Sequence, residues 1–511
     1  MMNYIKMTIA ASALLACCCV TVNAQEKTSP NIIFILADDL GWADTTLYGH
    51  TKLYPTPNIA RLAKRGMTFT RAYSNSPLCS PTRASLLTGQ TPARHGSTRP
   101  EHHIPGVVRL KAVVDASAPP GVKARSVSSV TRLDTRFPTL GKLFKAKGYQ
   151  TAHFGKWHLG HDPYTPLNHG FDVSLPHAAG SGPAGGYLAP WKYKELKNPK
   201  PNEHIEDRMA QEATQWFDSL QSDRPFFMNY WQFSVHAPFQ AKEELIEMYR
   251  KKIDPKDAQR SALYAAMVHS LDDAVGTLLD MVDAAGIADN TIIVFYSDNG
   301  GHMYAKLPDA PSATSNRPLR GGKGTIFEGG IRVPAIVVWP GVTTPGSRSD
   351  EPIQTSDFYP TFAQQLGLDV PGDHVVDGLD ILPVLKGGKL DRDAIFTYFP
   401  FAPQRVPDWL PDSVCVHAGD WKLIRLFHGG EDGKHGYRLY NLAEDLGETT
   451  DLSSQYPERV ASLDKKIEEY LTESNAVVPL PNPAFDPAQY RPELVGVPGA
   501  KSSKKKGKRR K

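Results

Sequence analysis

Two hydrophobic patterns alternate along the first two thirds of the chain. Continuous apolar runs favour strands that are buried on both faces of a parallel sheet, whereas apolar residues three and four positions apart favour amphipathic helices. The predicted strands lie at residues 31–37, 67–72, 149–154, 226–233, 291–295 and 331–339. The predicted helices lie between them, at residues 57–65, 138–147 and 261–284. This alternation predicts an α/β fold in which helices sandwich a large mixed, mostly parallel sheet.

The pattern changes near Asp391, where the chain enters a different kind of structure. Residues 421–427 and 437–442 flank a glycine-rich turn and predict a β-hairpin. Residues 458–471 follow with apolar positions at helical spacing. We therefore expect a smaller C-terminal α+β subdomain.

These patterns predict four segments along the chain. Residues 1–24 are a leader, residues 25–390 the main domain, and residues 391–475 the α+β subdomain. Residues 476–511 form a proline-rich extension that ends in a basic tail, which we expect to be disordered.

The charge of the chain resides mainly in that tail. The composition, with 41% hydrophobic and 22% charged residues, is ordinary for a soluble globular protein. The formal net charge is +4, but residues 501–511 alone carry eight lysines and arginines and no acid. The body of the protein is net negative, so its charge gives no indication of nucleic acid binding.

The first 24 residues are typical of an export signal. Lys6 precedes an apolar run, and Val22-Asn23-Ala24 offers a small-residue cleavage site before Gln25. The apolar run is too short to predict a transmembrane span. Residues 14–17 (L-L-A-C) also resemble a bacterial lipoprotein cleavage box, which would leave a lipidated Cys17. In both cases we expect an exported protein, periplasmic or secreted.

Few cysteines remain after such cleavage. Of five cysteines in the chain, only Cys79 and Cys415 lie beyond residue 24. Two cysteines are too few for a disulfide framework. A single Cys79–Cys415 disulfide is one possibility; a lone buried Cys415 with a chemically active Cys79 is the other.

Cys79 lies in the segment S-P-L-C-S-P-T-R-A-S-L-L-T-G, residues 76–89. Ser80 is a suitable N-cap, and Pro81 suits the first turn of the helix that follows. This arrangement would place Cys79 just before a helix N-terminus, where free N–H groups and the helix dipole favour a bound anion.

Two predicted strands end in acidic or amide residues. Asp38 and Asp39 follow the strand at 31–37, and Asp298 and Asn299 follow the strand at 291–295. Ligands gather at the carboxyl ends of the strands in open α/β sheets. Carboxylate and amide oxygens converging there would suit Ca²⁺ or Mg²⁺. The alternative is that the first pair caps a helix and the second forms a turn.

Several motifs, in order, resemble those of the sulfatase family of the alkaline phosphatase superfamily. They are D-D at 38–39, C-x-P-x-R at 79–83 with T-G at 88–89, G-K-W-H-L-G at 155–160, H-x-P-F at 236–239, S-D-N-G-G at 297–301, and G-G-K-G-T-x-x-E-G-G-x-R-V-P at 321–334. The resemblance covers most of residues 30–475. It implies an alkaline phosphatase-like fold, with residues 25–390 as the catalytic domain.

The resemblance also implies a nucleophile and a metal site. A maturation enzyme, formylglycine-generating or anaerobic, would convert Cys79 to formylglycine (3-oxoalanine), and a hydroxyl of its hydrate would attack the sulfur of a sulfate ester. One Ca²⁺ would be bound by four side chains and by an oxygen of modified Cys79. The four are Asp38, Asp39, Asp298 and Asn299.

The remaining implied roles concern charge and protons. Arg83 would orient the formylglycine hydrate, and His158 would steady it and help to eliminate sulfate. Lys156 and Lys323 would contact sulfate oxygens, and His236 would donate a proton to the leaving alcohol.

The substrate is expected to be a sulfated carbohydrate or an aryl sulfate. One alternative is a phosphonate or phosphodiester hydrolase of the same superfamily, and another is a non-catalytic protein that binds sulfated glycans. The loops at 92–134 and 176–201 and the hairpin near Trp421 are expected to form the rim of the site. Residue type suggests four sugar contacts: Trp191, Tyr193, Arg405 and Trp409.

Overall fold

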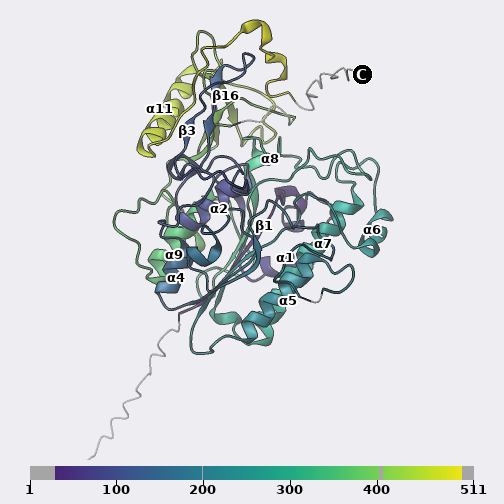
Figure 1. Cartoon of the computed structure of the whole chain (residues 1–511). Coiled ribbons are helices and arrows are strands. Elements are labelled where there is room, and N and C mark those ends of the chain that lie inside the picture. The colour runs from purple at the N-terminus through teal and green to yellow at the C-terminus, as the bar shows by residue number, and fades with distance from the viewer. Residues whose placement is uncertain (1–28, 198, 402–406, 498–511) are drawn as a thin grey trace, which may run out of the picture.

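The structure is a computed structural model that describes residues 29–197, 199–401 and 407–497. The predictions for the leader, for Arg405 and for the basic tail at 501–511 lie outside the described residues. Within the described part, no helix combines the length and the apolar character needed to cross a membrane. Figure 1 shows a large unit around a central sheet and a smaller unit that carries α11 and β16.

The central sheet has nine strands, with β1 (Asn31–Ala37) in its interior. Strands β8 (Phe226–Trp231) and β9 (Thr291–Ser297) flank β1, and both are parallel to it. The order is β11-β2-β10-β9-β1-β8-β6-β7, with β12 also paired to β2. The other bounds are β2 Met67–Tyr73, β6 Gln150–Lys156, β7 Val173–Ala178, β10 Arg332–Val338, β11 Ser347–Ser349 and β12 Ile353–Gln354. Of these nine strands β10 alone runs opposite to the rest, which confirms the prediction of a mixed, mostly parallel sheet.

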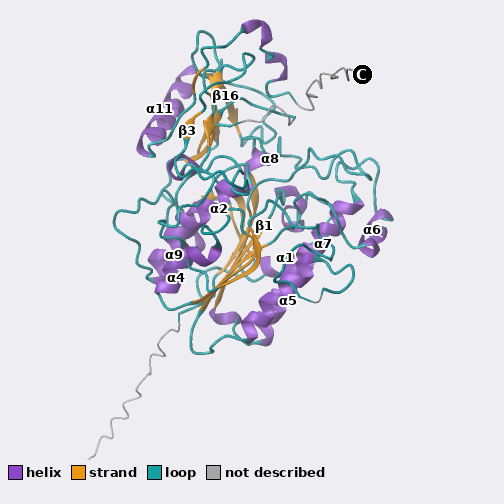
Figure 2. Cartoon of the chain, in the orientation of Figure 1, coloured by secondary structure: helices purple, strands orange, loops and turns teal. Residues whose placement is uncertain are grey.

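Helices cover both faces of the sheet (Figure 2). Alternate residues of β1 point to opposite faces, so Ile33 and Ile35 belong to one hydrophobic cluster and Phe34 and Leu36 to another. The first cluster includes residues of α1 Pro57–Ala63, α5 Ile205–Asp218, α6 Glu243–Arg250 and α7 Ala262–Ala284. The second includes residues of α2 Cys79–Thr88, α4 Leu140–Ala146, α9 Phe358–Leu366 and α10 Leu382–Leu385. The continuous apolar runs of the sequence follow from this burial on two sides.

One local prediction needs correction. Helix α2 begins at Cys79, with Leu78 as its extended N-cap residue, so Cys79 lies in the first turn rather than before it. Ser80 does not cap the helix because its hydroxyl donates a hydrogen bond to the carbonyl of His158 at 2.8 Å. The side chain that could have capped the helix instead connects it to the segment after β6.

The smaller unit contains a four-stranded antiparallel sheet in the order β13-β14-β15-β16. Its bounds are β13 Ile395–Phe399, β14 Ser413–Ala418, β15 Trp421–Leu426, β16 Gly436–Asn441 and, packed on one face, α11 Pro457–Glu473. The predicted hairpin corresponds to β15 and β16, and the predicted helix to α11. Strands β13 and β14 were not predicted; each is short, with five and six residues.

The insertion at 92–134 is mostly irregular, as predicted. It contains only short elements: α3 Pro92–His95, β3 Val113–Val114, β4 Ala124–Arg125 and β5 Val127–Ser128. Strand β17 (Leu480–Pro481) of the proline-rich extension pairs with β4, so the extension packs against this insertion. The remaining short helices are α8 Glu328–Ile331 and the 3₁₀ turns Trp42–Asp44, Thr46–Tyr48, Pro166–His169, Ala288–Asn290, Thr355–Asp357, Pro487–Gln489 and Pro492–Leu494.

A buried carboxylate joins two helices on one face of the sheet. Asp272 of α7 accepts hydrogen bonds from the backbone N–H groups of Asn58 and Ile59 at 2.9 and 2.8 Å, and so caps α1 from outside.

We expect Asp272→Ala to lower the free energy of unfolding by about 1–3 kcal/mol, because these donors lose their acceptor. Thermal melting would measure the loss. The control is Asp273→Ala, which removes the exposed neighbouring carboxylate; equal melting temperatures for the two variants would contradict the capping role.

Candidate active site

The residues singled out in the sequence meet at the carboxyl edge of the central sheet. Asp38 directly follows β1, Asp298 directly follows β9, and Lys156 is the last residue of β6. Because β1, β6, β8 and β9 are parallel, these ends lie along the same edge. Possible ligand atoms of Asp38, Cys79 and Asp298 all lie within 4.8 Å of one another. The chain thus brings a sulfur atom and two carboxylates, distant in sequence, to one point.

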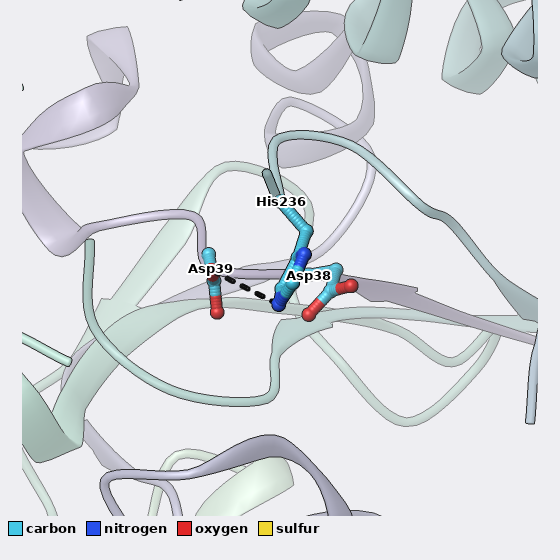
Figure 3. A group of neighbouring side chains, drawn as sticks. All are labelled: Asp38, Asp39 and His236. Atoms are coloured by element: carbon cyan, nitrogen blue, oxygen red, sulfur yellow. Dashed lines mark ion pairs between the residues drawn. The ribbon is translucent and has the colours of Figure 1, made fainter. Parts of the chain in front are cut away.

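A second group overlaps the first at Asp38. Figure 3 shows the side chains of Asp38, Asp39 and His236 converging from two loops, with the ion pair between His236 and Asp39 dashed. The distance from His236 Nε2 to Asp39 Oδ2 is 3.9 Å. Possible ligand atoms of these three residues also lie within 4.8 Å of one another.

Arg83 holds the carboxylate of Asp298 from the second turn of α2. Its Nε and Nη2 both donate to Asp298 Oδ2, at 2.9 and 2.7 Å, and its Nη1 donates to the carbonyl of Lys156 at 2.8 Å. All of these side chains are buried. Arg83 therefore connects the helix that carries Cys79 to the ends of β9 and β6.

Two lysines neutralise the adjacent carboxylates. Lys156 Nζ donates to Asp38 Oδ2 at 2.6 Å, and Lys323 Nζ contacts Asp39 at 2.7 Å. Burial raises the pKa of Asp38 well above its usual range, since Lys156 only partly compensates and Asp298 and Asp39 repel its charge. Burial acts in the same direction on Asp39, but the positive charges of its neighbours, above all Lys323, outweigh it and hold the pKa of Asp39 well below its usual range.

The backbone at Asp39 is unusual. Its φ is +64°, a left-handed conformation that Asp tolerates better than most residues. The N–H of Asp39 donates to Asp298 Oδ1 at 3.1 Å, and Asn299 Nδ2 donates to Asp39 Oδ1 at 2.8 Å. The turn after β1 and the turn after β9 are thus bound directly to each other.

Two oxygen atoms at this point lack a hydrogen bond. Among the described residues, neither Asp38 Oδ1 nor Asn299 Oδ1 has a hydrogen-bond partner, although both are buried. Buried polar atoms are almost always satisfied, so each such atom needs an explanation. Hard oxygen ligands beside three carboxylates fit a divalent cation such as Ca²⁺. The residues present are therefore compatible with the predicted metal.

Cys79 is almost fully buried and faces a pair of histidines. Its Sγ lies 3.3 Å from His158 Nδ1, and His158 Nε2 lies 3.0 Å from His103 Nδ1. Burial raises the pKa of the Cys79 thiol, against the opposing effect of Lys156 and Lys323. A thiol with a raised pKa is a weak nucleophile at neutral pH, so the unmodified side chain is poorly suited to attack.

The second cysteine does not pair with the first. Within the described part of the chain both Cys79 and Cys415 are free and buried, and Cys415 lies on β14 of the smaller sheet. The disulfide considered from the sequence is therefore absent, and Cys79 remains available for modification.

His158 and His236 are both neutral in these surroundings. Burial, together with the positive charge of Lys156, lowers the pKa of His158 well below its usual range. Burial and the positive charges of Lys323 and Lys156 do the same to the pKa of His236. A negatively charged ligand beside His236 would favour its protonated form.

The loop that carries His236 is fixed from α5. Glu206, at the start of α5, accepts hydrogen bonds from the N–H groups of Phe233 and Ser234, both at 2.8 Å. Tyr187 donates its hydroxyl to the carbonyl of His236 at 2.8 Å. His236 itself contacts the next carbonyl, of Ala237, through Nδ1, which leaves Nε2 directed at Asp39.

Two histidines of the site were missed in the sequence. His103 belongs to the irregular insertion, and only its contact with His158 shows its relevance. His302 follows S-D-N-G-G directly, and its buried Nδ1 has no hydrogen-bond partner in the described residues. Lys323 and Asp39 both influence its pKa, which burial lowers. Proximity to the S-D-N-G-G motif could have indicated His302, whereas nothing in the sequence pattern indicates His103.

The predicted sugar contacts behave differently from one another. Trp191 packs in the core beside α5 and donates its Nε1–H to Tyr187, so it is not an open stacking surface in this structure. The hydroxyl of Tyr193 accepts a hydrogen bond from the N–H of Ala184. Trp409, 9% exposed, lines a cavity of about 280 Å³ between the insertion and the smaller unit. A sugar-binding role for Trp409 stays a prediction.

Comparison with known proteins defines the class. The profile of the Sulfatase family matches residues 30–368, and the profile of the C-terminal region of N-sulphoglucosamine sulphohydrolase matches residues 322–476. The chain therefore belongs to the sulfatase family, as the motifs predicted, and has its alkaline phosphatase-like fold. It is a sulfuric ester hydrolase.

Particular relatives agree with this assignment. A sulfatase of Formosa agariphila is 32% identical and aligns over 91% of this chain and 92% of its own length. The N-acetylgalactosamine-6-sulfatase of Homo sapiens is 34% identical over 72% of this chain and 68% of its own length. A crystal structure of Ps i-CgsB in complex with k-i-k-neocarrahexaose superposes with a TM-score of 0.70 at 28% identity, covering 87% of this chain and 93% of that one.

The buried position of Arg83 makes it a sensitive test of the charge balance. We expect Arg83→Met to destabilise the protein by about 3–5 kcal/mol, because it leaves the carboxylate of Asp298 buried without its partner. Thermal melting would show this as a clear decrease in the melting temperature. Arg136→Met is the control, since Arg136 pairs with Asp134 while 84% exposed. Similar melting curves for both variants would show that Arg83 does not balance the site.

Proposed function

We propose that the protein is an exported sulfatase that removes sulfate from a carbohydrate, using formylglycine formed from Cys79 and one Ca²⁺. The observation that carries this proposal is the convergence of Cys79 Sγ with oxygens of Asp38 and Asp298 within 4.8 Å. Two lysines lie at that point, together with buried oxygens that have no hydrogen-bond partner among the described residues. Support for export comes from residues 1–24 alone.

The cation would be held by residues already in place. Asp38, Asp39, Asp298 and Asn299 supply hard oxygen ligands, and Arg83 fixes the orientation of Asp298. When bound, Ca²⁺ would supply positive charge that favours a sulfate group. Lys156 and Lys323, which contact Asp38 and Asp39, would add to that positive charge.

The nucleophile would come from residue 79. Formylglycine supplies, as its hydrate, an oxygen nucleophile suited to attack on sulfur. His158 Nδ1, 3.3 Å from the sulfur of Cys79, can accept or donate a proton at that position. His103, hydrogen-bonded to the other nitrogen of His158, would hold the ring in place.

The positive side chains would bind the substrate's charge. Lys323 is 13% exposed and Lys156 fully buried, so Lys323 lies on the solvent side of the site and Lys156 at its base. Both can donate to sulfate oxygens on which charge increases during cleavage. His236, protonated beside the bound anion, would donate its Nε2 proton to the leaving oxygen.

A carbohydrate substrate is supported by the relatives. The names of two similar proteins refer to N-acetylgalactosamine 6-sulfate chemistry and to a bound neocarrahexaose. A phosphonate monoester hydrolase of Agrobacterium radiobacter shares the fold, with a TM-score of 0.61, but only 20% identity. It provides the competing activity against which the proposal is tested.

The first experiment compares substrates and examines Cys79. We expect the purified protein to hydrolyse an aryl sulfate and a sulfated oligosaccharide at least tenfold faster, in kcat/KM, than an aryl phosphodiester; tenfold corresponds to about 1.4 kcal/mol of transition-state preference. Mass spectrometry of protein from a host with the maturation enzyme should show a Cys79 peptide lighter by the change from thiol to aldehyde. Cys79→Ala should abolish sulfate ester hydrolysis, and its peptide should show no conversion to the aldehyde. A preference for the phosphodiester, or an unmodified Cys79 in active protein, would overturn the proposal.

The second experiment measures cation binding without activity. We expect Ca²⁺ at about 100 times its Kd to stabilise the protein by about 2.7 kcal/mol relative to protein in chelator, because it binds only the folded state. Melting temperatures with Ca²⁺ and with chelator measure this stabilisation, and Asp39→Asn should remove most of the difference between them. Asp289→Asn, at an exposed carboxylate away from the site, should keep it. No effect of Ca²⁺ on the wild-type protein would exclude this metal site.

A further inference from the structure

The loop that carries Lys323 is bound on one side by the catalytic sheet. The N–H of Lys323 donates to the carbonyl of Gly301 at 3.1 Å, and that of Gly324 donates to the carbonyl of Pro77 at 2.9 Å. These bonds connect the loop to the segment after β9 and to the segment before Cys79. A second set of contacts holds the same loop on the side that faces the smaller sheet.

The smaller sheet binds the loop through Glu328, the first residue of α8, which is fully buried. Its Oε1 accepts hydrogen bonds from His417 Nε2 at 2.8 Å and from Lys422 Nζ at 3.0 Å. His417 on β14 and Lys422 on β15 are cross-strand partners. One carboxylate of the catalytic domain is thus bound by two strands of the C-terminal unit.

Glu448 completes this buried cluster. Its Oε1 lies 2.8 Å from Lys422 Nζ, and its Oε2 accepts a hydrogen bond from the N–H of Glu328 at 2.7 Å. Lys422 lies between two carboxylates, and all three side chains are completely buried. Breaking such a cluster by removing one partner is strongly unfavourable, so its geometry is well determined.

Arg320 adds a second connection at the start of the loop. Its Nε donates to Asp408 Oδ1 at 3.0 Å, its Nη1 donates to the carbonyl of Glu448 at 2.7 Å, and its Nη2 donates to the carbonyl of Gly496. The guanidinium lies 3.9 Å from the centre of the Phe327 ring. Both ends of the 320–328 segment are therefore attached to the C-terminal unit.

The segment between these attachments is rigidly packed. The N–H of Gly329 donates to the carbonyl of Arg320 at 2.7 Å, which closes the loop on itself. A Cβ atom at Gly329 would lie 2.4 Å from the carbonyl oxygen of Gly321, and one at Gly330 would lie 2.0 Å from that of Thr325. Because neither glycine can be replaced without moving the backbone, a displacement at Glu328 or Arg320 is transmitted along the loop.

We propose that Lys422 and Arg320 are positioning residues: through Glu328 and Glu448 the C-terminal unit sets the place of Lys323 and thereby the affinity of the site for sulfate. This inference rests on the proposed function, in which Lys323 contacts a sulfate oxygen. The C-terminal unit is then a necessary part of the sulfate site, because it holds the loop that carries Lys323.

The test is to weaken the connection and to measure sulfate binding. We expect Lys422→Met and Arg320→Met to weaken the binding of inorganic sulfate, measured by calorimetry, by about 10-fold or more, because small displacements of a positioned group have large effects. Their kcat/KM for an aryl sulfate, per formylglycine-containing molecule, should fall by a similar factor. Lys422→Arg, which keeps the charge, should recover part of the loss.

Arg425→Met provides a matched control. Arg425 lies on β15 three residues after Lys422 and is equally buried, but it pairs with Asp464 and Glu468 of α11 on the other face. Its loss should lower the melting temperature while sulfate affinity and kcat/KM stay at wild-type values. If the Lys422 and Arg320 variants behave like Arg425→Met, the proposal is wrong.

The Arg320 variant keeps the proposal testable if the Lys422 variant is unstable. Arg320 is partly exposed (16%), whereas Lys422 is completely buried, so we expect Arg320→Met to disturb folding less than Lys422→Met does. Calorimetry with sulfate does not require turnover, and it reports on the connection even if the wild-type protein prefers another ester. If the wild-type protein hydrolyses aryl sulfates and both variants bind sulfate with wild-type affinity, the positioning role is wrong and the proposed function stands.

Discussion

The structure depends on a balance of buried charge at the carboxyl edge of one sheet. Three carboxylates, Asp38, Asp39 and Asp298, are fully removed from solvent within one small volume. Their mutual repulsion in a region of low dielectric would be prohibitive without compensation. Arg83 and Lys156 provide part of it, as does a third cation, Lys323, and each comes from a different segment. Among the described residues the buried oxygens Asp38 Oδ1 and Asn299 Oδ1 have no hydrogen-bond partner, which is compatible with the cation proposed at this point.

The same constraint explains why distant segments are tied together so closely. A misplaced lysine would leave a carboxylate unpaired, so each cation must be held in place by its own supports. The Arg83 guanidinium joins the end of β6 to the end of β9, and hydrogen bonds from the loop around Lys323 reach both Gly301 and Pro77. On the opposite side, the fully buried Glu328 passes this constraint to the smaller sheet. Catalytic chemistry and domain packing are therefore parts of one network.

Much of the fold could be predicted because its signals are local. A strand buried on both faces must be apolar throughout, so β1 and β9 could be predicted from the apolar runs at 31–37 and 291–295. Short strands such as β13 carry too few residues for a pattern. The N-cap residue of α2 is Leu78 rather than the predicted Ser80, whose hydroxyl donates to the distant carbonyl of His158. The acidic strand ends indicated the site, while His103 became apparent only from its contact with His158.

The sequence by itself determined the α/β architecture, the motifs of the family and the list of residues able to bind a cation and an anion. Tertiary structure alone decided which of them act together: that Cys79 faces His158, that Lys156 pairs with Asp38 and Lys323 with Asp39, and that Cys79 and Cys415 remain free thiols. The physical reason is that the sequence gives the type of each side chain, whereas Coulomb energy and desolvation depend on distances and burial that only the folded chain fixes.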